Sequence, residues 1–176
     1  MKQKIFSFDV ESNSLWPEAL GSSAAFCIGA VVVTPDGQVE MFLARCPIEG
    51  EVNEWVKNNV LPQLKDVPVT HNSYRDMLES FASFYMKHKE GSDIIVHVGF
   101  PVEARVLLDM HRFGFIGDWD APFPLIDIST FPEIGTSVDS YVEKNDLSLE
   151  MVEGMSTHNP LYDAAVTLLA YNHLMQ

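Results

Sequence analysis

Basic side chains are scarce in this sequence. Its 176 residues include 11 lysines and arginines against 25 aspartates and glutamates, which gives a formal net charge of −14 at pH 7. Binding to a long duplex normally rests on many phosphate contacts from lysine and arginine. The composition therefore argues against a broad duplex-binding face, whereas a short substrate held at its end by metal ions is compatible with it. We expect some of the acid at a site that cations neutralise and most of it on solvated surface.

Long apolar runs are absent as well. No stretch approaches the roughly 18 residues that a membrane-spanning helix needs. Residues 1–4 lead directly into the strand-like residues 5–8, without the apolar core of a signal peptide. We therefore expect a cytoplasmic protein with no membrane partner.

Cysteine is rare, and neither Cys27 nor Cys46 belongs to a CxxC or metal-ligand pattern. Both are interpreted as structural thiols, because free cysteine is among the most buried residue types. The remaining composition, with 47% hydrophobic and 20% charged residues, is typical of a globular protein. Because the chain has no repeat, linker or biased tract, we expect a single domain over residues 1–176.

Three strands are predicted at the start of the chain, at residues 4–10, 24–33 and 38–45. Residues 24–33 form a continuous apolar and β-branched run, which is typical of a buried central strand. The turn signal at residues 35–37 favours a hairpin between the second and third strands. The chain is therefore predicted to open with a three-stranded antiparallel meander.

Helices and strands alternate after this meander. Asn159 is a good N-cap, and Pro160 suits the first position of the last helix. This order predicts an α/β fold in which helices flank a mixed central sheet. The predicted helices cover residues 51–60, 73–89 and 102–113 and begin again at 160; the predicted strands cover residues 93–98 and 124–128.

Asp9 and Glu11 form an Asp-x-Glu pattern at the end of the first strand. Residues two apart in a strand project from the same face, so the two carboxylates are held together. Their repulsion favours a hard divalent cation between them, such as Mg²⁺ or Mn²⁺, which takes oxygen ligands. Taken alone, such a pattern at a strand end is more often a solvated turn.

His158 and Asp163 are spaced H-x4-D across the start of the last helix. Asp163 falls in the first helical turn, where the helix dipole favours an ionised carboxylate. His158 lies just outside the helix and has an ordinary pKa near neutrality, as a general base requires. The pair suits a fixed metal ligand beside a general base, and the alternative is a helix-start aspartate beside a surface histidine.

Together the two patterns resemble the first and third motifs of the DEDDh 3′→5′ exonucleases. This group of the ribonuclease-H-like superfamily includes ribonuclease T, oligoribonuclease and polymerase proofreading domains. The chain length, the opening meander and the closing helix match as well, so the resemblance covers nearly the whole chain. It implies a ribonuclease-H-like fold and a metal-dependent exonuclease.

The middle motif departs from the family pattern. In residues 95–107, Glu103 occupies the position of the usual aspartate, and Gly99 replaces the usual asparagine. Glutamate is one methylene longer but offers the same acceptor oxygens. Glu103 is therefore predicted to support a metal, often through water in this family, and the alternative is a glutamate that faces solvent.

The resemblance implies a role for each of these side chains. Asp9 would bridge two Mg²⁺ or Mn²⁺ ions, Glu11 and Asp163 would complete the inner site, and Glu103 would support the outer one. His158 would deprotonate the attacking water, and the in-line displacement would release nucleoside 5′-monophosphates from the 3′ end.

Substrate contacts are predicted at Ser12, Asn13, Leu15 and Trp16, which follow the first motif and in related enzymes meet the terminal nucleotide. Leu15 or Trp16 would stack on the terminal base, unless Trp16 covers the edge of the core.

Phe100 and Arg105 are further candidates near the middle motif. Phe100 would form an aromatic wall or pack in the core, and Arg105 would meet a phosphate or form a surface salt bridge.

Two rival functions remain open. One is a nucleotide- or nucleic-acid-binding module whose catalytic site has decayed at Glu103, and the other is an acidic interaction protein on the same fold. Within the exonuclease hypothesis, we slightly favour short single-stranded RNA over DNA, because the acidic chain lacks a duplex-binding surface. Several small relatives are homodimers, so a homodimer is also considered.

Overall fold

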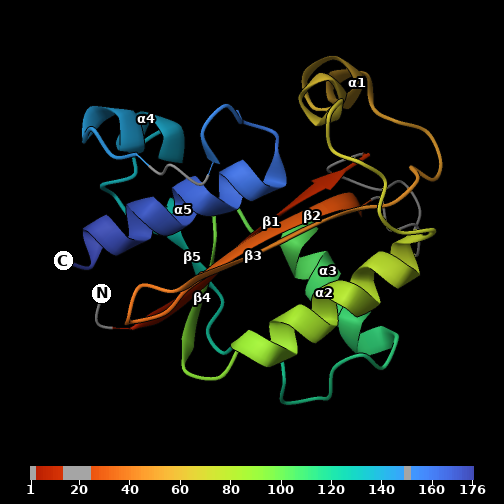
Figure 1. The fold of residues 1–176 in the computed structure, drawn as a ribbon, viewed down its shortest axis with the longest axis horizontal. Helices are drawn as coiled ribbons and strands as arrows, with labels where there is room; N and C mark the ends of the chain where they lie inside the picture. Colours follow the sequence, from red (N-terminus) through yellow and green to blue (C-terminus); the bar gives the residue numbers. More distant parts are fainter. Residues whose placement is uncertain (1–2, 14–24, 149–151) are drawn as a thin grey trace.

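A computed structural model describes residues 3–13, 25–148 and 152–176. Its five-stranded sheet has the order β3-β2-β1-β4-β5 (Figure 1). β1 pairs with β2, and β2 with β3, in antiparallel fashion, whereas the β1–β4 and β4–β5 pairs are parallel. The predicted mixed sheet and its opening antiparallel meander are therefore confirmed. The strands are β1 (Lys4–Ser12), β2 (Ala25–Val33), β3 (Val39–Arg45), β4 (Ser92–Val96) and β5 (Ile126–Asp127).

Helices cover both faces of the sheet. In Figure 1, α4 and α5 lie on one side of the strands and α2 and α3 on the other. The helical elements are α1 (Glu54–Asn59), η1 (Leu61–Leu64), α2 (Tyr74–His88), α3 (Val102–Arg112), η2 (Ile128–Thr130), α4 (Val138–Lys144) and α5 (Pro160–Leu174). No helix among the described residues is both long and apolar enough to cross a membrane.

The alternation of β1 divides the interior into two cores. Phe6, Phe8 and Val10 point to the core beneath α2 and α3. Ile5 belongs to the core beneath α4 and α5. Because side chains alternate along a strand, Asp9 projects on the same side as Ile5, toward α5. One face of β1 thus carries large aromatic rings, while the other changes from apolar to acidic along its length.

Three predicted elements are shorter in the structure by more than one residue at an end. The helix predicted at 51–60 covers only Glu54–Asn59, because the Asn53 side chain caps its start by accepting the Trp55 N–H and a 3-10 turn begins at Leu61. The strand predicted at 93–98 ends at Val96, since Val98 adopts a φ of 57°. The strand predicted at 124–128 is reduced to two residues, because the Asp127 side chain caps the next turn by accepting the Ser129 N–H.

Candidate active site

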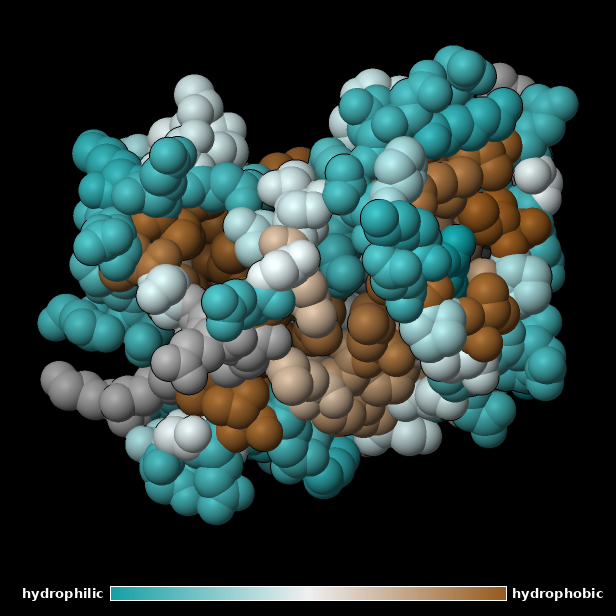
Figure 2. Space-filling view, turned by 45° about the horizontal axis from the view of Figure 1, so that its top comes forward, coloured by the Kyte–Doolittle hydropathy of each residue, from teal (hydrophilic) through white to brown (hydrophobic). Residues whose placement is uncertain are grey.

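A cavity of about 810 Å³ opens at the carboxyl end of β1. Its walls come from the end of β1, from α1, from the segment that enters α3, from α4 and from the start of α5. In Figure 2 the outline of the molecule is notched between the side that carries α4 and the side that carries α1. Four carboxylates that the sequence predicts as metal ligands line this cavity: Asp9, Glu11, Glu103 and Asp163.

Strand β1 delivers the first two carboxylates. β1 pairs with β4 only as far as Ser7, so the strand continues beyond its parallel neighbour. The register with β2 shifts between Glu11 and Ser12, as in a β-bulge, directly after the second carboxylate. Such irregularities re-aim side chains next to active sites. The sheet thus ends its regular pairing at the point where Asp9 and Glu11 enter the cavity.

The start of helix α5 packs closely against the sheet at Gly29. This glycine pairs with Asp9 across the β1–β2 ladder. A Cβ atom built on Gly29 would lie 2.2 Å from the Leu161 backbone nitrogen and 2.3 Å from the Pro160 carbonyl carbon. No larger residue fits between strand and helix, because real contacts of this kind are much longer. Gly29 therefore lets the first turn of α5, and with it Asp163, approach β1.

Glu103 enters the cavity from the first turn of α3. Glu103 is only 4% exposed, so the alternative prediction that it faces solvent is wrong. The Val10 backbone N–H donates to Glu103 Oε1 at 3.1 Å. One carboxylate oxygen is thus held against β1, one residue from Asp9.

The loop that leads into α3 is held by Asp127. Its two carboxylate oxygens accept the N–H groups of Val98 and Gly99 at 3.0 and 2.9 Å. Val98 lines the cavity and has a φ of 57°, a left-handed conformation that costs a β-branched residue about 1–3 kcal/mol. Backbone strain of this kind gathers at functional sites, where the surroundings impose it.

The carboxylates of this cavity resist ionisation. Burial raises the pKa of Asp9 to about 7. Burial, and after it the negative charge of its three carboxylate neighbours, raises the pKa of Glu11 to about 10. The pKa values of Glu103 and Asp163 also lie well above the ordinary range, first because of burial and then because of Asp9. The cluster therefore holds protons that a bound cation would displace.

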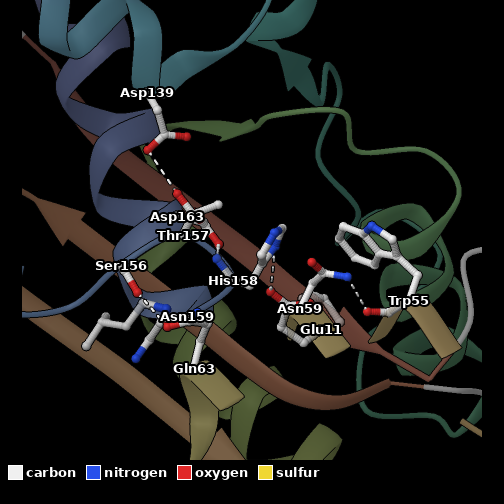
Figure 3. Close-up of polar contacts among 12 residues, drawn as sticks. Glu11, Trp55, Asn59, Gln63, Asp139, Ser156, Thr157, His158, Asn159 and Asp163 are labelled. Carbon is white, nitrogen blue, oxygen red and sulfur yellow. Dashed lines mark hydrogen bonds and ion pairs between the residues drawn. The ribbon is translucent and has the colours of Figure 1, made fainter. Parts of the chain in front are cut away.

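His158 lies at the mouth of this cluster. It has a φ of 70° and precedes Asn159, the N-cap of α5. Its backbone N–H donates to Asp163 Oδ2 at 2.8 Å, and its Nδ1 lies 3.9 Å from Glu11 Oε1 (Figure 3). Burial lowers the pKa of the imidazole, which keeps it neutral at pH 7 and able to accept a proton.

The donor set suits a hard divalent cation. Single ligand atoms of Glu11, His158 and Asp163 all lie within 4.8 Å of one another. Carboxylate oxygens are the ligands that Mg²⁺ and Mn²⁺ prefer, and a cation would relieve the repulsion that keeps these groups protonated. The residues present therefore fit a divalent metal.

Of the predicted substrate-contact residues that the structure describes, only Ser12 lines the cavity. The amide of Asn13 turns away from it and donates to the Glu49 carbonyl at 2.8 Å. Phe100 is 69% exposed and lies outside the lining of the cavity, so it does not pack in the core. Arg105 also lies outside the lining, and its Nε is 3.2 Å from Asp109 Oδ1. Leu15 and Trp16 fall outside the described residues.

The cavity lining also includes side chains that sequence analysis did not select, among them Trp55, His97 and Asp139. Trp55 is 55% exposed, and its ring meets that of His158 edge to face, with the centroids 5.1 Å apart. Asp139 comes from α4. No local pattern marks either residue, because the contacts that bring them to the cavity join segments about 100 and 20 positions apart in the chain.

Comparison with known proteins supports the fold. No family model matches the sequence, and no curated protein matches it. Solved structures of exonuclease I do match. One is a structure of exonuclease I that suggests how processivity is achieved, with a TM-score of 0.59 and 12% sequence identity. The match covers 94% of this chain and 39% of the exonuclease I chain. A product-bound structure of exonuclease I has a TM-score of 0.55 and 12% identity, with coverage of 98% and 44%.

These matches establish the architecture. The chain has the ribonuclease-H-like α/β fold that is found within exonuclease I. It spans less than half the length of each of those exonuclease I chains. An identity of 12% carries the fold and not the chemistry.

Proposed function

We propose that this protein is a metal-dependent 3′→5′ exonuclease of the DEDDh type. The observation that carries the proposal is the convergence of four buried or half-buried carboxylates and one histidine in an open cavity. They come from segments as far apart as residues 9 and 163, on a fold shared with exonuclease I. Structural packing alone does not explain four carboxyl groups gathered where burial makes each of them costly to ionise.

Asp9, Glu11 and Asp163 would hold the inner of two Mg²⁺ or Mn²⁺ ions, and Glu103 would support the outer one. When bound, the ions supply charge stabilisation for the attacking and leaving oxygens of the scissile phosphate. His158 accepts the proton of the attacking water, because its pKa is lowered and the imidazole is neutral at pH 7. Asp163 orients this histidine by accepting its backbone N–H.

The substrate we propose is a short single strand, with RNA slightly favoured over DNA. Among the described residues that line the cavity there is no lysine or arginine. Phosphates therefore gain little from cationic side chains there, and a substrate held by its 3′-terminal phosphodiester suits this cavity better than a long strand. Trp55 offers an exposed ring on which a terminal base would stack. The products are nucleoside 5′-monophosphates.

A homodimer is part of the proposal, because a partner subunit would supply the basic residues that this cavity lacks. A cytoplasmic location also remains an expectation.

The test is degradation of single-stranded RNA and DNA oligonucleotides labelled at the 5′ end, with Mn²⁺, with Mg²⁺ and with EDTA. Wild type is compared with Asp9→Ala and with Asp118→Asn, a control that removes an exposed carboxylate outside the cavity. We expect a ladder that shortens stepwise from the 3′ end, requires metal, is lost in Asp9→Ala and persists in Asp118→Asn. The ratio of the RNA and DNA rates gives the sugar preference.

Failure of the wild type to shorten any of these substrates would overturn the exonuclease. If the same oligonucleotides then bound with an affinity that Asp9→Ala does not change, a binding module would replace the exonuclease hypothesis. The variant Glu103→Asp, which restores the usual family residue, would then test whether glutamate at this position had removed the activity.

A further inference from the structure

Asp139 is the one carboxylate in the described cavity lining that the proposed chemistry does not use. It lies in the first turn of α4, whose N-cap is Ser137. Two hydroxyl groups donate to the same oxygen, Asp139 Oδ1: the Tyr162 hydroxyl at 3.2 Å and the Thr157 hydroxyl at 3.3 Å. Asp139 thus joins α4 to the chain on both sides of His158.

The segment that carries His158 has no regular structure of its own. Thr157 directly precedes His158, and the left-handed φ of 70° at the histidine separates it from α5. For this reason the direction of the imidazole depends on where residues 156–158 are anchored. Figure 3 shows Asp139 reaching Thr157 from α4, on the opposite side of His158 from Trp55.

The other anchors come from the opposite wall. The Ser156 hydroxyl donates to Gln63 Oε1 of η1 at 2.8 Å. On α1, the Trp55 ring meets the imidazole edge to face at 5.1 Å. The 54–64 segment therefore contacts the histidine segment at two points, and α4 contacts it through Asp139. Without the bond from Thr157, the described polar contacts of residues 156–158 with other elements would be those with Gln63, Asp163 and Glu11.

We infer that Asp139 is a positioning residue, which holds His158 toward Glu11 through its hydrogen bonds with Thr157 and Tyr162. The inference rests on the proposed function, in which His158 is the general base. A direct role as a metal ligand is the competing interpretation. The two hydroxyl groups that donate to Asp139 Oδ1 favour the positioning role, because they engage this oxygen within the protein.

Three variants separate the two interpretations. In Asp139→Asn an amide oxygen remains to accept both hydroxyl groups, whereas the negative charge is lost. Asp139→Ala removes charge and acceptor together. Thr157→Val keeps the shape of the threonine side chain and removes its donor. A positioning role needs the acceptor, while a metal ligand needs the charge.

We expect Asp139→Ala and Thr157→Val to lower kcat about 10- to 100-fold on the oligonucleotide, with KM and the Mn²⁺ dependence changed less than about twofold. Asp139→Asn should retain kcat within about twofold. The double variant Asp139→Ala with Thr157→Val should lose no more than Asp139→Ala alone, because both changes break the same bond. Thermal unfolding of each variant checks that the chain folds.

A second readout does not depend on turnover. In a Trp16→Phe, Trp119→Phe background, Trp55 is the remaining tryptophan, and its emission reports the imidazole that it touches. Asp139→Ala and Thr157→Val should shift this emission, and Asp139→Asn should not. If wild type hydrolyses nothing but the emission follows this pattern, the exonuclease proposal fails while the positioning role stands.

Two results would overturn the positioning role itself. One is an active wild type in which Asp139→Asn loses as much kcat as Asp139→Ala, which would assign Asp139 to the metals. The other is unchanged kcat and unchanged Trp55 emission in both Asp139→Ala and Thr157→Val.

Discussion

The two halves of β1 differ in the chemistry of their side chains. In the first half, Phe6 and Phe8 are at most 1% exposed, and their rings pack edge to face with the centroids 6.2 Å apart. The ring centroid of Phe81 lies 5.5 Å from that of Phe8. In the second half, Asp9 and Glu11 meet Glu103 and Asp163 in a cavity. Burial of the apolar rings in the first half stabilises the fold, whereas burial of the carboxyl groups in the second half disfavours their ionised form.

This contrast explains how the fold tolerates its candidate site. A cluster of ionised carboxylates destabilises its own packing without a cation, because its members repel one another. The aromatic half of the strand, the Gly29 contact with α5 and the loop held by Asp127 fix the backbone that carries the charges. Stability and chemistry are thus divided between two ends of one strand, and substitutions at each end should act on different properties.

The largest effect is expected at the charged end. Asp9→Ala should lower the rate of exonucleolytic hydrolysis at least about 10⁴-fold, since the metal charge stabilisation that Asp9 supports amounts to several kcal/mol. The free energy of unfolding should not fall with it. Rates under saturating Mn²⁺ and chemical denaturation in EDTA check the two parts. A variant that loses activity only in proportion to its unfolded fraction would erase the contrast.

His158→Ala is expected to come next, with kcat reduced about 10³-fold because proton transfer from the attacking water is lost. Binding of Mn²⁺ should remain, which calorimetry measures. If metal affinity disappears together with kcat, His158 serves as a ligand and belongs to the metal site. For wild type at saturating Mn²⁺, kcat/KM should fall only below the ordinary pKa of histidine, because burial lowers the pKa of His158.

Phe8→Ala tests the apolar end. Removing this ring from a fully packed position should reduce the free energy of unfolding by about 3–4 kcal/mol. The rate per folded molecule should stay near that of wild type, measured at a temperature where the variant is folded. Loss of activity in a folded Phe8→Ala protein would mean that the two halves of β1 are coupled more tightly than we infer.

The smallest effect has the opposite sign. Without metal, Glu11→Gln should raise the free energy of unfolding by about 1–2 kcal/mol at pH 8, because the amide is neutral without the proton that Glu11 must take up on folding. The pKa of Glu11 is raised to about 10 in the folded protein. A raised carboxyl pKa stabilises the fold at low pH, and this stabilisation is lost as pH rises toward the folded value.

The advantage of Glu11→Gln over wild type should therefore shrink as pH is lowered toward 5. Denaturation of both proteins in EDTA across this range measures the difference. A difference that is independent of pH would mean that Glu11 is ionised without cost.

Much of the fold could be predicted because its signals are local. The continuous apolar run of β2 predicts a buried strand, and Asn159 followed by Pro160 marks the start of α5, as the structure has it. The shortness of β5 could not be predicted, because Asp127 caps the following turn instead of extending the strand. Its capping competes with strand pairing, and propensity alone does not decide between them.

The candidate site was predictable only where residues share a motif. Asp9 and Glu11, or His158 and Asp163, are neighbours in sequence, and the structure brings both pairs and Glu103 into one cavity. Their catalytic roles remain predictions. Trp55 and Asp139 reach the same cavity through tertiary contacts with His158 and Thr157, which leave no periodic or spacing signal in the chain.

The central claim is that the charged end of β1 is a cation site. Calorimetric titration of Mn²⁺ at pH 7.5, in two buffers with different ionisation enthalpies, tests it most directly on wild type, Asp9→Asn and the control Asp118→Asn. We predict saturable binding with release of protons in wild type and in the control, because the pKa of Glu11 is raised to about 10 and its carboxyl holds a proton at pH 7.5. We predict loss of that binding in Asp9→Asn. No saturable binding in wild type, or the same isotherm in Asp9→Asn, would contradict the account.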